Sequence, residues 1–99
     1  MCPYIKQEDR KVLDIYINNI VALLLEDKEK LSGKFNYVIT KIITKMVHEY
    51  KEGDLIYKNK NYRFMNDLIG VLECVKQEFY RRVMANYEDY KCKEHGDVY

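Results

Sequence analysis

Residues 62–87, YRFMNDLIGVLECVKQEFYRRVMANY, decide the fold of this chain. Apolar side chains recur along this stretch at alternating steps of three and four residues, which places them on one side of an α-helix. No proline interrupts the stretch, and strong helix formers fill most of it. We therefore predict a long helix over 62–87 with one buried stripe. That stripe consists of Met65, Leu68, Leu72, Val75, Phe79 and Val83.

Two further helices are predicted, over residues 9–31 and 35–51. In the first, Asp9 is a candidate N-cap and Ser32-Gly33 is expected to close the helix. The second contains β-branched runs that are also typical of a strand, but its three-four spacing favours a helix. Asn61 is the expected N-cap of the helix over 62–87. Gly70 lies inside that helix, where we expect another backbone to approach closely.

The two ends of the chain carry no helical period. Residues 1–8 are expected to form a short arm. Residues 88–99 are expected to form a tail that is partly docked on the helices or on another subunit, because Tyr87, Tyr90 and Tyr99 give it more aromatic character than a disordered segment has. These features predict an all-α fold: a compact bundle of three main helices in a single domain, 1–99.

The composition restricts the function. Nearly half of the 99 residues are hydrophobic and ten are tyrosines, which is more apolar material than three solvated helices need. We therefore expect a homo-oligomer. The net charge of +1 argues against binding to duplex nucleic acid. No apolar run is long enough for a membrane span. The N-terminus lacks a signal peptide and the three cysteines have no framework spacing, so we expect a cytoplasmic protein with free thiols.

Catalytic and metal-binding patterns are weak. Cys92 and His95 have a ligand-like spacing, but zinc sites usually show two such pairs. Formal acidic pairs, typical of magnesium-dependent nucleotide hydrolases, lie near helix ends or in the tail. These pairs are Glu26 with Glu29, Glu49 with Glu52, and Glu94 with Asp97. No nucleophile motif or phosphate-binding glycine loop is present. We predict a protein that is not an enzyme and has no metal or cofactor, with a hydrolase as the weakest alternative.

Tyrosines beside cations form the candidate ligand site. Aromatic faces stack on nucleobases, and arginine guanidiniums bind phosphates through two parallel hydrogen bonds. Solvated cations and tyrosines in a helix interface explain the same pattern without a ligand. Glu78 is spaced to pair with Arg82, which leaves Arg81 as the preferred phosphate contact. The candidate residues are Asn36, Tyr37, Thr40, Lys41, Tyr80, Arg81 and Arg82.

Five segments resemble a small family of uncharacterised proteins known mainly from tailed bacteriophage genomes. They are PYIKQEDR at 3–10, FNYVITK at 35–41, NDLIGVLECVKQEFYRRV at 66–83, YEDYK at 87–91 and HGDVY at 95–99. Relatives typically have proline at the position of Asn86 and asparagine at that of His95. The resemblance implies a small helical phage-type protein without an assigned reaction, and its genomic setting suggests host takeover or counter-defence.

Together these features give two hypotheses for the function. The first is a non-catalytic protein that sequesters a nucleotide-like or other anionic signalling molecule. The second is a protein-interaction module that inhibits or regulates a host or phage protein.

Overall fold

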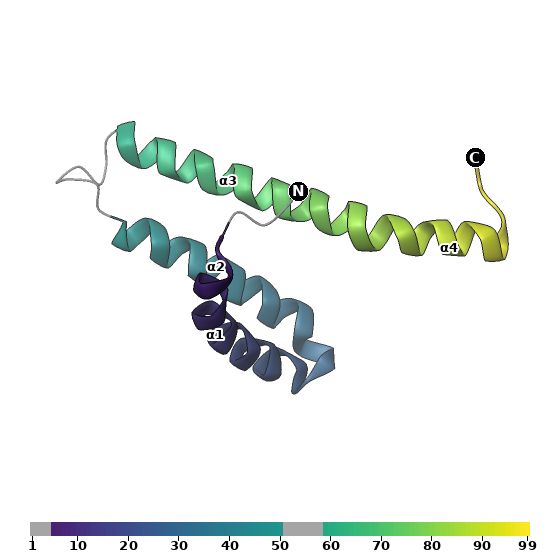
Figure 1. The fold of residues 1–99 in the computed structure, drawn as a ribbon, viewed down its shortest axis with the longest axis horizontal. Coiled ribbons are helices and arrows are strands. Elements are labelled where there is room, and N and C mark those ends of the chain that lie inside the picture. The colour runs from purple at the N-terminus through teal and green to yellow at the C-terminus, as the bar shows by residue number, and fades with distance from the viewer. Residues whose placement is uncertain (1–4, 51–58) are drawn as a thin grey trace. The chain divides into compact units, whose positions relative to one another are not determined.

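The computed structural model describes residues 5–50 and 59–99, and every regular element in them is helical (Figure 1). The predicted all-α class is therefore confirmed. The main helices are α1 (Gln7–Leu25), α2 (Leu31–Glu49), α3 (Asn59–Phe79) and α4 (Ala85–His95). A 3-10 turn, η1 (Lys28–Lys30), precedes α2, and a π-helical segment, η2 (Tyr80–Met84), joins α3 to α4. The chain divides into two units, residues 1–49 and 50–99, which are described in turn.

Helix α1 begins two residues before the predicted N-cap. Lys6 is the capping residue and offers no side-chain hydrogen bond, whereas Asp9 lies within the first turn. Acidic side chains there interact favourably with the positive end of the helix dipole. The Arg10 guanidinium folds back and donates to the carbonyl oxygen of Ile5 from Nε at 3.3 Å and from Nη2 at 3.1 Å.

The boundary between the first two helices differs from the prediction. Helix α1 ends at Leu25, and Asp27 adopts extended backbone angles of φ −133° and ψ 100°. Its carboxylate accepts a hydrogen bond from the Glu29 amide at 3.1 Å, and such a local bond competes with helix continuation. Ser32 and Gly33, the predicted stop, instead lie inside the first turn of α2. Glycine permits a helix end but does not require one.

Helix α2 contains the β-branched runs, which confirms the helical interpretation of them. It begins at Leu31, four residues before the predicted start, and ends at Glu49 rather than at residue 51. The expected stop at Gly53-Asp54 and the expected short turn at 55–57 lie outside the described residues.

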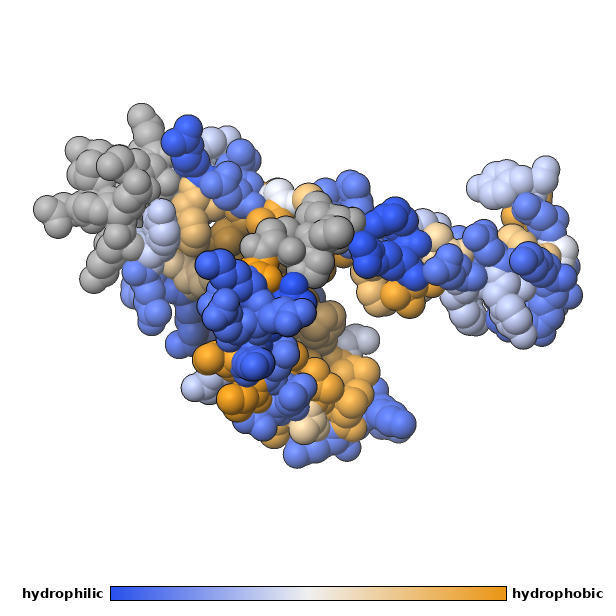
Figure 2. Space-filling view, in the orientation of Figure 1, coloured by the Kyte–Doolittle hydropathy of each residue, from blue (hydrophilic) through white to orange (hydrophobic). Residues whose placement is uncertain are grey.

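The first unit buries little apolar surface. Among the described residues only Leu24, with 9% of its surface exposed, is a buried apolar residue. Ile15, Leu23 and many other large apolar side chains of α1 and α2 remain exposed. Figure 2 shows orange, hydrophobic side chains on the surface of this helical hairpin.

The second unit is one nearly continuous helix of α3, η2 and α4 (Figure 1). It begins at Asn59, so Asn61 lies within the first turn and is not the N-cap. At the end of η2, the Ala85 amide donates to the carbonyl oxygen of Tyr80, five residues back. The Asn86 side-chain amide donates to the carbonyl oxygen of Arg82 at 2.8 Å.

The prediction of a non-helical tail from residue 88 is wrong, because α4 continues to His95. Extension of an existing helix does not carry the cost of a new helical nucleus, so weak periodicity is no obstacle. Local pairs support it: Lys91 lies 3.5 Å from the Glu94 carboxylate and 5.8 Å from the ring centroids of Tyr87 and Tyr90. Gly96, at φ 86°, ends the helix, and its amide donates to the Cys92 carbonyl oxygen at 2.8 Å. Val98 and Tyr99 beyond it are fully exposed.

Most of the stripe over α3 is exposed in the chain, contrary to the prediction of a buried stripe. Leu68 is half-buried, whereas Leu72, at the centre of the stripe, keeps 40% of its surface exposed. A Cβ built at Gly70 meets no atom within 4 Å, so no other backbone among the described residues of the second unit approaches it closely. Periodicity correctly identifies residues that share a face, but it does not specify what covers that face. Within the described residues, no helix combines the length and the apolar character needed to cross a membrane.

Candidate functional site

A groove of about 420 Å³ lies between the end of α1 and the start of α2. The short connection through Asp27 and η1 brings these two helix ends together. Apolar side chains form most of the lining, and Gly33 leaves space because a Cβ there would meet no atom within 4 Å. The lining also contains two charged side chains, Glu26 and Lys34. The lining residues are Ile20, Leu23, Leu24, Glu26, Gly33, Lys34, Tyr37 and Val38.

One of the predicted ligand residues of α2 lines this groove. Tyr37 does so with 62% of its surface exposed, so its ring is accessible. Asn36, Thr40 and Lys41 are exposed on the same helix and are not lining residues of the groove. The Thr40 hydroxyl donates to Asn36 Oδ1 at 3.1 Å, one turn back. This hydrogen bond joins two residues of α2 and supports that helix locally.

Sequence reasoning missed Lys34, a half-buried cation in the groove. It stands three residues before Tyr37, so the two side chains share a helix face. The three-residue spacing of Lys34 and Tyr37 can be read from the sequence. Lys34 was not grouped with Tyr37 because the predicted helix begins at residue 35, one residue after Lys34.

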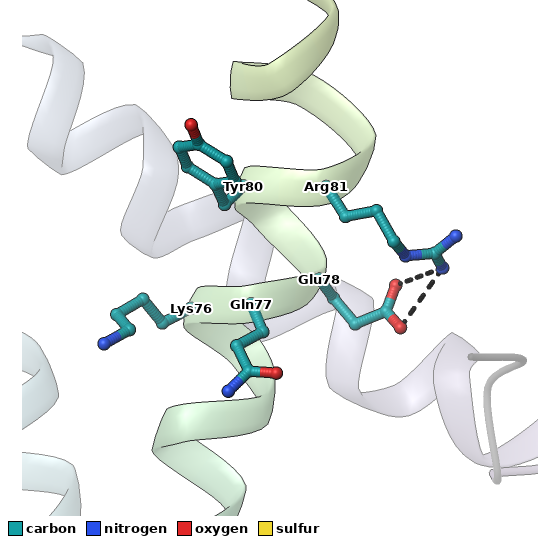
Figure 3. A pocket seen from close by; sticks show the side chains of 5 residues that line it. All are labelled: Lys76, Gln77, Glu78, Tyr80 and Arg81. Atoms are coloured by element: carbon teal, nitrogen blue, oxygen red, sulfur yellow. Dashed lines mark hydrogen bonds and ion pairs between the residues drawn. The ribbon is translucent and has the colours of Figure 1, made fainter.

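The second predicted set lies in the other unit, at η2 (Figure 3). The two arginines bind the same carboxylate. Arg81 Nη2 lies 3.0 Å from Glu78 Oε2, as Figure 3 shows, and Arg82 Nε lies 2.8 Å from the same oxygen. The predicted pairing of Glu78 with Arg82 is confirmed, but this pairing does not leave Arg81 without an acid, because Arg81 binds the same carboxylate from three residues away. Residues three and four positions along a helix both lie beside the first residue, so both guanidiniums reach one acid.

Arg81 and Tyr80 point in different directions. A hollow of about 480 Å³ is lined by Lys76, Gln77, Glu78, Tyr80 and Arg81. In Figure 3, Lys76 and Tyr80 extend away from the Glu78–Arg81 pair, so these residues do not converge on one point. Lys76 is engaged as well, because its Nζ lies 3.1 Å from Glu73 Oε1. This ion pair and a hydrogen bond from Gln77 lower the pKa of Glu73.

Tyr80 is held by α4. Its hydroxyl donates to Glu88 Oε2 at 3.0 Å, which ties the start of η2 to the first turn of the next helix. This hydrogen bond, together with the negative charges of Glu88 and Asp89, raises the pKa of Tyr80.

We expect Tyr80 to titrate above the ordinary tyrosine range. The hydrogen bond stabilises the helix junction at all pH values below the ordinary tyrosine pKa, and this contribution is lost as pH rises through the raised pKa. NMR of protein labelled at the tyrosine ring Cζ measures the midpoint directly. Glu88→Gln should move it down towards the value of free tyrosine, whereas the control Glu94→Gln should leave it in place. An identical midpoint in wild type and Glu88→Gln would contradict this assignment.

Metal-binding geometry is not found in the part of the chain that the structure describes. No group of three or more His, Cys, Asp or Glu side chains there could hold an ion. Cys92 is an exposed free thiol, and His95 Nε2 lies 3.6 Å from its neighbour Glu94. Glu52, one of the formal acidic pair members, lies outside the described residues.

The fold and both sites thus define a small all-α protein with an apolar groove and a charged helix junction. A family model described as Domain of unknown function (DUF6899) matches residues 2–98, and the chain belongs to this family. No curated protein matches the chain. No solved structure matches it.

Proposed function

We propose that this protein is a non-catalytic interaction module that binds a partner protein through the groove between α1 and α2. The observation that supports this proposal is the exposure of apolar side chains throughout the hairpin, where Leu24 alone among the described residues is a buried apolar residue. Exposed apolar patches on soluble proteins commonly mark interaction sites. The resemblance to phage proteins suggests a host or phage protein as the partner.

The groove suits an amphipathic helix. Two antiparallel neighbouring helices present a channel between them, and apolar residues at helical spacing on a third helix fill such a channel. Glu26 and Lys34 provide opposite charges beside the apolar lining, which would set the direction of the incoming helix. Leu23, with 59% of its surface exposed, is the accessible apolar contact in this lining.

Matched charge substitutions on α1 test the proposal. Leu23→Glu places a charge in the groove, whereas Ile15→Glu places the same charge outside it on a residue 60% exposed. The first step is to find a protein in bacterial lysate that wild type and Ile15→Glu recover but Leu23→Glu does not. This partner is then purified, and its binding to each variant is titrated by calorimetry. We expect its affinity to fall at least about tenfold for Leu23→Glu alone. Equal affinity for the two variants would exclude the groove as the binding site.

An anionic ligand is the second candidate, favoured by Lys34 and Tyr37 in the same groove. The tyrosine ring can stack on a base and the ammonium can bind a phosphate. A panel of nucleotide second messengers tested by calorimetry should give binding that Lys34→Ala and Tyr37→Ala weaken and the control Lys41→Ala does not. Heating the complex should return the nucleotide intact, whereas a cleaved product would indicate a hydrolase. A contribution of Arg81 and Arg82 stays a prediction, and it requires an anion to displace Glu78.

A further inference from the structure

The apolar stripe of the second unit continues across η2 into α4. Its early steps alternate three and four residues, from Met65 through Leu68, Leu72 and Val75 to Phe79. The next step, from Phe79 to Val83, is four residues where the alternation requires three. The alternation then resumes with Tyr87 and Tyr90.

The π-helical segment absorbs this additional residue. It covers Tyr80–Met84, the place where the step is one residue too long, and its closing hydrogen bond spans five residues instead of four. A π turn accommodates one extra residue without ending the helix. Val83, Tyr87 and Tyr90 therefore stay on the same face as the stripe of α3, in the seven-residue repeat that is typical of paired helices.

This continuous stripe is long and exposed. From Met65 to Tyr90 it extends about 38 Å at 1.5 Å per residue, whereas α1 and α2, with 19 residues each, are about 28 Å long. No helix of the first unit matches its length. The stripe residues from Val75 onwards are each more than half exposed: Val75, Phe79, Val83, Tyr87 and Tyr90.

We propose that a second copy of this chain covers the stripe, with the two α3–η2–α4 helices paired along their length. A helix of the same chain is equal in length and carries the same seven-residue repeat with the same interruption. Full coverage of the eight side chains would bury roughly 600–700 Å² per chain, and the pair total of about 1,300 Å² lies in the range of specific interfaces. Because the net charge of the chain is only +1, electrostatic repulsion between two copies opposes their association little. This interface lies in the unit without the partner groove, so either proposal can fail alone.

Matched aspartate substitutions test the interface. Sedimentation equilibrium at micromolar concentration should give twice the chain mass of 12.0 kDa for wild type. Phe79→Asp should give the single-chain mass, because the charge lies at the centre of the stripe. The control Cys74→Asp, on an exposed residue about 140° from the centre of the stripe, should remain a dimer. A wild-type protein of single-chain mass, or dissociation by both substitutions, would overturn the proposal.

A register variant tests the role of the π turn. Deletion of Arg82 removes the additional residue, so an uninterrupted α-helix then keeps Val83, Tyr87 and Tyr90 on the face of the stripe. Deletion of Arg81 and Arg82 together removes one residue more and rotates these three side chains by about 100° away from the stripe. We expect the single deletion to dimerise as wild type does and the double deletion to weaken the dimer at least about tenfold, while the helix content by circular dichroism matches wild type in both. The double substitution of Arg81 and Arg82 with alanine, which keeps the chain length and removes both ion pairs with Glu78, is the control and should dimerise as wild type does. Equal dimerisation of the two deletions would contradict the register argument.

Discussion

Replacement of Leu24 with alanine is expected to lower the free energy of unfolding of the α1–α2 hairpin by about 2–3 kcal/mol. Leu24 is the one buried apolar residue among those that the structure describes. Its loss removes apolar burial from both helices where they meet beside the groove. The open groove lets neighbouring side chains move partly into the space, so the expected cost lies at the lower end of the range for buried leucines. Urea denaturation followed by circular dichroism measures it.

The adjacent residue supplies the control. Leu23→Ala removes the same atoms from a side chain that is largely exposed, so it should cost less than about 1 kcal/mol. Helix propensity changes equally in the two variants. Equal losses at the two positions would show that the packing between α1 and α2 is not centred on Leu24.

The thermal stability of the protein is expected to rise with its concentration. For two chains that fold and associate together, each tenfold increase in concentration adds about 1.4 kcal/mol per dimer. For roughly 200 residues in the pair this corresponds to about 3–6 °C in the unfolding midpoint, or about 6–12 °C over a hundredfold range. Far-ultraviolet circular dichroism across that range measures the shift.

Phe79→Asp provides the comparison for this measurement. A variant that cannot pair should unfold at one temperature whatever its concentration, and below the wild type at high concentration. A wild-type midpoint that does not change over the hundredfold range would mean that the long helix has a different source of stability.

The periodicity of the sequence was sufficient to predict the helical class and the long helix around Leu72. It was also sufficient to predict a helix at the β-branched runs of α2, because apolar spacing outweighs local propensity in a half-buried element. Glu78 and Arg82 were correctly paired for the same geometric reason, since residues four apart lie one above the other.

The residues at which the helices begin and end depend on local hydrogen bonds and on the extension of neighbouring helices, and apolar periodicity describes neither. A capping carboxylate at Asp27 ended α1 although the apolar pattern continued, whereas Gly33 did not end α2. Helix α4 formed although it carries only the last two residues of the stripe, Tyr87 and Tyr90, because it extends α3. Both arginines bind Glu78 because residues three and four positions after it lie on the same side of a helix, and a pairing based on the four-residue spacing alone did not include Arg81.

The candidate site was predicted only in part. Sequence reasoning selected Tyr37 for its chemistry, but the α1–α2 packing decided that Tyr37 and Lys34 share a groove and that Asn36 and Lys41 do not line it. The sequence by itself therefore determined which residues are helical and which of them share a face, because both depend on neighbours within one or two turns. Only the tertiary structure decided which of those faces are buried and which side chains meet, because both depend on segments that are distant along the chain.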